Sequence, residues 1–224
     1  MSPRRLYTIP LPGRPPLQLG ARTLVMGILN VTPDSFADGG VHFDVERAAE
    51  AGVRMAADGA DIIDIGGEST RPGAEPLPEA EELRRVLPVV ERLAREVKVP
   101  LSIDTYKAAV AREALARGAT IINDVSGLQY DLALGEVAAS SGAALILMHM
   151  RGRSSGMYDH AAYADAARDV ASELEAAIER AVRAGVSREA VIVDPGLGFA
   201  KHAEHSYEVL AGLDRLASLD RPIL

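Results

Sequence analysis

The chain has 224 residues, of which 48% are hydrophobic and 25% charged, so it is long enough to bury one substantial core as a single globular domain. Its formal net charge of −8 and its aromatic content of only 4% argue against a nucleic-acid surface, so an anionic substrate must be bound by local groups. There is no cysteine, no apolar run of about 18 residues and no hydrophobic leader, which argues against disulfides, thiolate chemistry and a membrane span and favours a cytoplasmic protein.

The N-terminal residues predict a small separate element. Leu6 to Ile9 and Leu17 to Leu19 lie on either side of a Pro/Gly turn, which is typical of a hairpin. We therefore expect residues 1–20 to form an arm or hairpin ahead of the main domain, residues 21–224.

After this element, short β-rich runs alternate with longer helical patterns. The strands are predicted at 24–29, 61–65, 100–103, 120–124, 143–148 and 190–193, with a further apolar run at 222–224. The helices are predicted at 44–58, with Asp44 as N-cap, and at 79–97, 106–117, 132–141, 161–184 and 204–216. A glycine follows four of these helices directly, where the left-handed conformation is common.

This alternation predicts a parallel α/β sheet, either a (β/α)8 TIM barrel or an open doubly wound sheet. Two observations favour the barrel. No strand is followed by a G-x-G-x-x-G turn, and polar groups follow every strand instead of clustering at one switch point. Because the pattern stops at Leu224, we expect the barrel to lack its last one or two βα units in this chain and a C-terminal segment to lie beyond it.

Polar side chains close the predicted strands at Asn30, Asp64, Asp104, Asn123 and Asp194. A single aspartate in such a place is often only the N-cap of the next helix. Several polar residues, each at the end of a successive predicted strand, predict a catalytic rim at the carboxyl ends of the strands.

Two long runs give the sequence a resemblance to a known family. They are 26–36, MGILNVTPDSF, and 64–73, DIGGESTRPG. Further agreement comes from 102–105 (SIDT), 122–127 (INDVSG), 148–150 (MHM) and 194–199 (DPGLGF). Together they closely resemble dihydropteroate synthase, in order and over residues 25–224.

The resemblance implies a reaction and its partners. The family condenses 6-hydroxymethyl-7,8-dihydropterin diphosphate with p-aminobenzoate and releases 7,8-dihydropteroate and diphosphate, assisted by Mg²⁺. It also implies a homodimer, small-molecule substrates, and neither nucleic acid nor membrane as a partner.

The resemblance also assigns the pterin contacts. Asp194 would accept two hydrogen bonds from the guanidine-like edge of the ring, and Asn123, which has both a donor and an acceptor, would bind the mixed edge. Asp104 would act on positive charge that develops on the ring as diphosphate departs. Met148 and Phe199 would line the substrate region.

The leaving group would be bound by a metal and a few donors. Asn30 matches the Mg²⁺ ligand, and one amide oxygen is sufficient because Mg²⁺ keeps several waters and uses phosphate oxygens. Thr70, Arg71 and Lys201 match further donors to the diphosphate.

The resemblance implies that two loops close over the reaction. The first carries Asp34, Ser35 and Phe36, and the second carries Thr70 and Arg71. Asp34 and Arg71 are expected to be catalytic with Asp104, and Ser35 and Phe36 to bind substrate. Closure would exclude water that could intercept a cationic intermediate.

Three polar residues have plainer interpretations. Asp124 is expected to be structural because it follows Asn123 and so points to the other side of its strand. His149 lies between two methionines, as packed core histidines do, and Arg151 taken alone indicates a solvated loop charge. Ala200 stands where the family commonly has glycine.

A second functional hypothesis is a pterin-binding module without synthase activity, or a folate/corrinoid methyltransferase-type domain. The family continues with Ser-Arg-Lys and Arg-x-His motifs, and the sequence stops before both. The Thr-Arg-Pro-Gly run at 70–73 favours the synthase.

Overall fold

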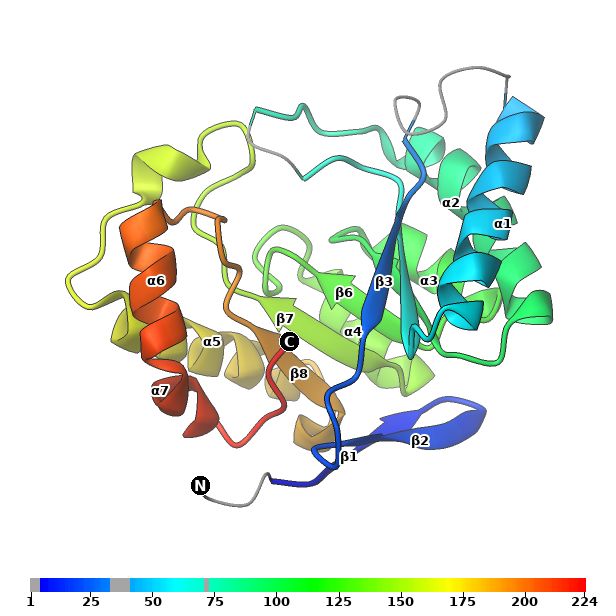
Figure 1. The fold of residues 1–224 in the computed structure, drawn as a ribbon. Coiled ribbons are helices and arrows are strands. Elements are labelled where there is room, and N and C mark those ends of the chain that lie inside the picture. Colours follow the sequence, from blue (N-terminus) through cyan, green and yellow to red (C-terminus); the bar gives the residue numbers. More distant parts are fainter. Residues whose placement is uncertain (1–4, 33–40, 71–72) are drawn as a thin grey trace.

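A curved parallel sheet with helices on its outside dominates the molecule (Figure 1). The structure is a computed structural model that describes residues 5–32, 41–70 and 73–224. Its six parallel strands follow one another in chain order, β3-β4-β5-β6-β7-β8. They are β3 Met26–Asn30, β4 Ile62–Gly66, β5 Leu101–Asp104, β6 Ile121–Asp124, β7 Ala144–Met148 and β8 Val191–Asp194.

The helices between the strands cover one face of this sheet. They are α1 Val41–Ala57, α2 Glu79–Glu96, α3 Ala108–Ala116, α4 Ala133–Ser141 and α5 Ala166–Arg183, followed after β8 by α6 Ala203–Ala211 and α7 Leu213–Ala217. Two short 3-10 helices, η2 Met157–His160 and η3 Arg188–Ala190, lie in the connections.

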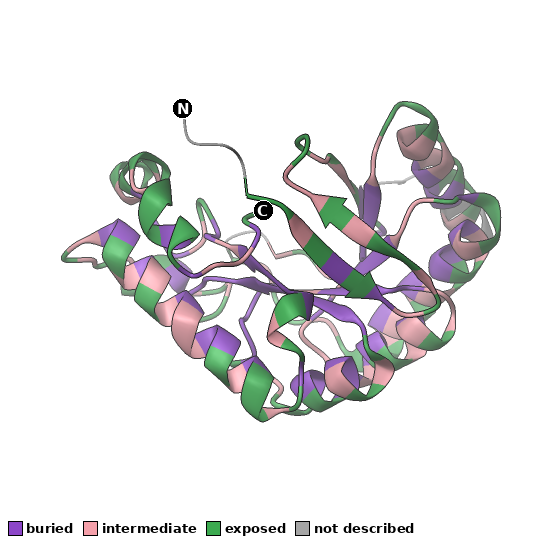
Figure 2. Cartoon of the chain, turned by 90° about the horizontal axis from the view of Figure 1, so that it is seen from below, coloured by how far each residue is buried: buried purple, intermediate pink, exposed green. Residues whose placement is uncertain are grey.

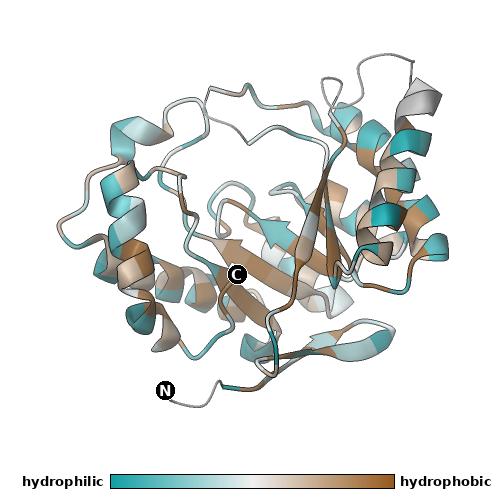
Figure 3. Ribbon diagram, in the orientation of Figure 1, coloured by the Kyte–Doolittle hydropathy of each residue, from teal (hydrophilic) through white to brown (hydrophobic). Residues whose placement is uncertain are grey.

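The strand order distinguishes a barrel from a doubly wound sheet. Right-handed crossovers that all advance in one direction place every helix on the same face, whereas a reversal of order would place helices on both. The order here never reverses, so the sheet curls with its second face inward. Buried residues lie along the strands and the inner sides of the helices (Figure 2), and β3, β7 and β8 are strongly apolar (Figure 3). The predicted barrel-type α/β fold is confirmed.

An antiparallel hairpin covers the end of the sheet where the strands begin. It consists of β1 Tyr7–Leu11 and β2 Arg14–Leu19, with Ile9 paired to Leu17. Ile9 is 1% exposed, and it belongs with Leu11 to a cluster that is separate from the main helix–sheet core. The cluster's other buried members are Ile62, Ile121, Ala144, Ile146 and Ile192. The hairpin therefore closes the amino end of the barrel interior.

Several predicted boundaries shift. The helix predicted from Asp44 begins at Val41, so Asp44 lies inside α1 and is not its N-cap. The pattern at 161–184 becomes a helix only at Ala166, where Asp165 accepts a hydrogen bond from the Arg168 amide, and the pattern at 204–216 divides into α6 and α7 at Gly212. The glycines after α1, α3, α4 and α5 have positive φ, as expected.

The last residues run beside β8. The amide of Val193 donates to Pro222 O at 3.0 Å, and that of Leu224 donates to Val193 O at 2.8 Å, which gives a parallel bridge between Val193 and Ile223. This is where the next strand of a barrel would lie. Among the described helices, none is long and apolar enough to cross a bilayer.

Candidate active site

The polar side chains predicted to share a rim lie on one face of the sheet. Residue pairing aligns Asn30 with Gly66, Gly66 with Asp104, and Asp104 with Asn123. The same row continues through β7 into β8 two residues before Asp194. Because side chains alternate along a strand, all these positions face the barrel interior at the carboxyl end of the strands.

Asn30 and Asp104 converge over Gly66. A Cβ atom at Gly66 would lie 3.2 Å from Asp104 Oδ2 and 3.7 Å from Asn30 Oδ1. Asn30 is exposed, so its amide oxygen is accessible from the mouth of the barrel. No group of three acidic, histidine or cysteine ligands occurs among the described residues. This donor set fits an ion such as Mg²⁺, which takes few protein oxygens and completes its shell with phosphate and water.

Asn123 also pairs with Asp64, which lies on β4 one layer deeper than the rim. Asn123 Nδ2 donates to Asp64 Oδ2 at 2.9 Å, and this bond fixes the orientation of the amide. The other oxygens, Asp64 Oδ1 and Asn123 Oδ1, are buried and have no hydrogen-bond partner among the described residues. Buried oxygens of this kind are costly unless a donor satisfies them, so the pair suits a ligand with several N–H groups.

Three carboxyl groups of the site are poorly solvated. Burial raises the pKa of Asp64 and of Asp194, although hydrogen bonds to each carboxylate oppose the shift. Burial raises the pKa of Asp104 well above its usual value, and the charge of nearby Asp64 adds to this. Such a site favours a ligand that brings N–H donors or positive charge.

The turn after β8 is held from two sides. Asp194 Oδ1 accepts a hydrogen bond from the Gly196 amide at 2.8 Å, and Lys201 Nζ donates to Gly196 O at 3.0 Å. Gly196 has φ +62°, and a Cβ atom there would lie 2.2 Å from His149 O, so only glycine fits. The glycine thus lets the turn approach the end of β7 closely.

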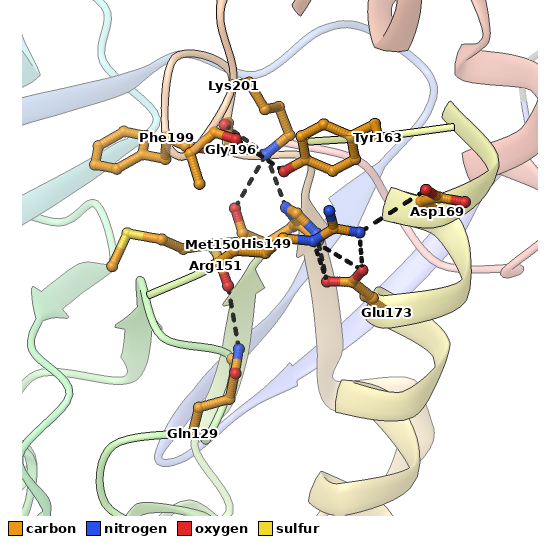
Figure 4. A network of polar contacts seen from close by, with 12 residues as sticks. Gln129, His149, Met150, Arg151, Tyr163, Asp169, Glu173, Gly196, Phe199 and Lys201 are labelled. Atoms are coloured by element: carbon orange, nitrogen blue, oxygen red, sulfur yellow. Dashed lines mark hydrogen bonds and ion pairs between the residues drawn. The ribbon is translucent and has the colours of Figure 1, made fainter. Parts of the chain in front are cut away.

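Lys201 is committed to protein groups in this structure. Besides Gly196 O, Nζ donates to Phe199 O at 3.0 Å and contacts His149 Nδ1 at 2.7 Å (Figure 4). Burial lowers the pKa of Lys201 to about 7. These contacts leave none of the ammonium N–H groups for a diphosphate, which is the role the resemblance implies, and place Lys201 at the base of the turn that carries Asp194.

Met148 and Phe199 contribute to one apolar cluster at the rim. Its buried members are Val125, Met148, Met150, Met157 and Ala200, against which Tyr106, Tyr130 and Phe199 pack. The cluster adjoins Asp194 because Met148 pairs with it in the sheet. An apolar wall beside convergent polar groups is typical of a site for a flat heterocycle.

An ion cluster at the base of the second loop is missing from the sequence-based prediction. Glu68 accepts hydrogen bonds from the Leu77 amide at 3.1 Å and from Tyr106 Oη at 2.9 Å. Lys107 Nζ forms ion pairs with Glu68 and with Glu82, which is only 1% exposed. The cluster joins the loop to α2 and the start of α3. Glu68 lies inside the DIGGESTRPG run, but the sequence has no signal for its partners.

The two loops are only partly described. Asp34, Ser35, Phe36 and Arg71 lie outside the described residues. Thr70, also in the second loop, is half-buried. Beyond it the Gly73 amide donates to Ser154 O at 2.9 Å, so the second loop contacts the loop after β7 across the mouth of the barrel (Figure 1).

The residues given plainer interpretations have different outcomes. Asp124 is structural, as expected, since it is fully buried and accepts hydrogen bonds from the amides of Ser126 and Leu128. Arg151 is not a solvated charge. It forms ion pairs with Glu173 and Asp169.

Comparison with known proteins settles the family. The model of the family described as pterin binding enzyme matches residues 26–224. This chain belongs to the pterin binding enzyme family. The dihydropteroate synthase of Bacillus subtilis (strain 168) is 47% identical over 203 residues, which cover 91% of this chain and 69% of that protein.

Solved structures agree with the family. The dihydropteroate synthase of Xanthomonas albilineans with 4-aminobenzoic acid has a TM-score of 0.87 and 45% identity, covering 96% of this chain and 77% of the other. The same enzyme in complex with 7,8-dihydropteroate has a TM-score of 0.82 and 41% identity, covering 96% and 76%. These relatives and solved structures confirm the dihydropteroate synthase function that the motifs predict. The chain is therefore a transferase of folate biosynthesis.

Proposed function

We propose that the rim of Asn30, Asp104, Asn123 and Asp194 joins a dihydropterin diphosphate to p-aminobenzoate. The amine nitrogen of p-aminobenzoate forms a bond to the exocyclic methylene carbon, and the carbon–oxygen bond to diphosphate breaks, its electron pair leaving with that group. The amine then loses a proton. The observation that carries the proposal is that these side chains come from four strands and face one interior space.

The deep end of this space would bind the pterin ring. Asp194 accepts charge-assisted hydrogen bonds from the ring N–H and amine, while Asn123 Oδ1 and Asp64 Oδ1 accept from the opposite edge. Since neither of these buried oxygens has a partner in the described part of the chain, the ring would supply hydrogen-bond donors to both. Met148 and Phe199, which belong to one apolar cluster, would pack against the face of the ring.

Asp104 would stabilise the transition state in which diphosphate departs. Its carboxylate is destabilised by burial and by neighbouring carboxylates, so positive charge that develops on the ring lowers its energy more than it would in water. This is differential binding of the transition state, which raises turnover instead of merely tightening substrate binding.

Asn30 and Thr70 would contact the diphosphate end. Mg²⁺ bound by Asn30 would supply charge neutralisation of the leaving group. Asp34, Arg71, Ser35 and Phe36 are proposed to complete this end from the two loops. A homodimer and a cytoplasmic location also remain predictions.

The test is release of diphosphate from pterin diphosphate and p-aminobenzoate by the purified protein with Mg²⁺. Asp104→Asn and Asp194→Asn should each reduce kcat/KM by about 100-fold or more, as loss of a transition-state electrostatic contact does. Asp58→Asn, an exposed aspartate after α1, is the matched control and should retain activity. Absence of turnover in the wild-type protein, or full activity in both site variants, would overturn the proposal.

Calorimetry distinguishes the synthase from a binding module. The synthase should bind p-aminobenzoate only when pterin diphosphate or diphosphate is present. A pterin-binding module would bind pterin without Mg²⁺ or diphosphate and would not respond to p-aminobenzoate.

A further inference from the structure

A chain of polar contacts links the rim to the outer helix α5. Lys201 Nζ contacts His149 Nδ1 at 2.7 Å, and His149 Nε2 contacts Glu173 Oε2 at 2.9 Å (Figure 4). Lys201 is 1% and His149 3% exposed, whereas Glu173 borders a cavity of about 100 Å³ between β7 and α5. The contacts therefore connect a buried lysine beside Asp194 with a helix that lies outside the barrel.

The chemistry of the three groups fixes where the hydrogens lie. Hydrogen bonds from His149 and Arg151 outweigh the effect of burial and lower the pKa of Glu173 to about 2, so it is a carboxylate and only accepts. The hydrogen of His149 must then lie on Nε2. The lone pair on Nδ1 accepts from Lys201, whose other two N–H groups donate to Gly196 O and Phe199 O.

Both partners in the pair have lowered pKa values. Burial lowers the pKa of Lys201 to about 7. Burial also lowers the pKa of His149, and the ordinary pKa of a histidine is already below that value. The shared proton therefore resides on Lys201. The charged or titratable groups that face this pair are Asp194 on β8, Glu173 and Asp169 on α5, Arg151 after β7, and Tyr163 before α5.

Glu173 is itself held in place. Arg151 Nε donates to its carboxylate at 3.0 Å, and Arg151 Nη1 donates to Ala162 O at 2.6 Å. The guanidinium carbon of Arg151 lies 4.0 Å from the ring centroid of Tyr163, whose hydroxyl donates to Ala200 O at 2.9 Å. The network thus returns to the residue next to Lys201, so its geometry is over-determined.

From these contacts we infer that His149 and Glu173 are positioning residues that hold the Lys201 ammonium against the turn carrying Asp194. Glu173 keeps the hydrogen of His149 on Nε2, and the free Nδ1 anchors Lys201. Lys201 in turn fixes Gly196, the residue whose amide orients the Asp194 carboxylate. The inference deepens the proposed function, and only its activity readout rests on that function.

The first experiment reads the tautomer directly. Imidazole ¹⁵N spectra of the wild-type protein at pH 6, with His149 assigned by difference from His149→Asn, should show the neutral Nε2–H form. A protonated Nδ1 would overturn the inference. This measurement needs no turnover.

The second experiment titrates Lys201 by ¹³C NMR. The chain has only three lysines, Lys98, Lys107 and Lys201. The variant Lys98→Arg removes one of the three lysine resonances and thereby assigns it to Lys98. Glu173→Gln should lower the midpoint of Lys201 by about one pH unit, a tenfold change, because a facing negative charge is lost. The matched control is Glu175→Gln, on the same helix but paired with Arg188, and it should leave the midpoint unchanged. Equal midpoints in wild type and Glu173→Gln would overturn the inference.

Substitutions of His149 separate position from bulk structure. In His149→Asn the amide oxygen can take the place of Nδ1, so the midpoint should stay near the wild-type value. In His149→Leu no acceptor remains, and the midpoint should fall by more than in Glu173→Gln. If His149→Asn and His149→Leu shift the Lys201 midpoint equally, the hydrogen bond to His149 Nδ1 has no role in holding Lys201.

The pH profile of turnover then tests the link to catalysis. We expect the alkaline limb of kcat/KM for pterin diphosphate to move with the Lys201 midpoint in Glu173→Gln and to stay in place in Glu175→Gln. A limb that stays in place while the midpoint moves would contradict the positioning role. If the NMR results are as expected but the protein shows no turnover, the proposed function is rejected and the positioning role of His149 and Glu173 is retained.

Discussion

At the scale of single residues, the buried carboxylate of Asp104 lowers the stability of the folded protein. Burial and then the negative charges of Asp64, Glu82, Asp124 and Glu68 raise its pKa well above the ordinary value. Between the ordinary and the raised pKa the folded state binds more protons than the unfolded chain, so this group lowers stability as pH rises through that window.

Asp104→Asn should therefore raise the free energy of unfolding at pH 8, by on the order of 1 kcal/mol, while it reduces turnover. Below about pH 4 the difference should vanish because the carboxyl is protonated in both states. Urea unfolding of both proteins at several pH values measures this. An Asp104→Asn protein that is less stable than the wild type at pH 8 would contradict the charge argument.

At the scale of elements, the Glu68–Lys107–Glu82 ion cluster joins the second loop to two helices. Removal of one member of a buried ion group leaves an uncompensated charge, which typically costs about 3–5 kcal/mol. Lys107→Met should destabilise the fold by an amount of this order, because Glu82 is 1% exposed and loses its cation.

Denaturant unfolding checks this prediction. Arg92→Met, which breaks the exposed Arg92–Glu96 pair on α2, is the control and should cost less than about 1 kcal/mol. Adding Glu82→Gln to Lys107→Met should restore part of the loss. No recovery in the double variant would show that packing dominates, not charge.

The hairpin is the second element with a testable contribution. Ile9 is buried in the cluster at the amino end of the barrel, opposite to the rim. Ile9→Ala should lower the free energy of unfolding by about 2–5 kcal/mol, as removal of a large core side chain does, and leave KM unchanged.

Thermal melts and steady-state kinetics test the hairpin prediction. Thr8→Ala changes the neighbouring exposed residue, whose hydroxyl donates to Gln18 across the hairpin, and should have a much smaller effect. A changed KM in Ile9→Ala at a temperature where the protein is folded would show that the hairpin affects the rim.

At the scale of the whole molecule, the net charge of −8 opposes an anionic substrate. Long-range attraction is absent, so the diphosphate depends on a local cation. We expect a chelator to weaken binding of pterin diphosphate strongly and to leave binding of the unphosphorylated hydroxymethyl pterin unchanged. Calorimetry with both ligands measures this, and Asn30→Ala should reproduce the chelator's effect. Equal weakening of both ligands would reject the proposed magnesium site.

The sequence alone determined the α/β class, the positions of the six parallel strands to within two residues and the rim of Asn30, Asp104, Asn123 and Asp194. Hydrophobic periodicity and strand-end position are local properties, and parallel strands bring their carboxyl ends to one edge. The tertiary structure decided the barrel-type order of the strands, which local pattern left open between two topologies.

Tertiary structure also decided which distant charges meet. Lys107 joins Glu68 and Glu82, and His149 joins Lys201 and Glu173, across separations in sequence of 24 residues or more. No local pattern contains these pairs, because they form where the loops after the strands and the outer helices come together in the folded chain. Burial then sets their pKa values, which depend on the folded surroundings and not on residue type.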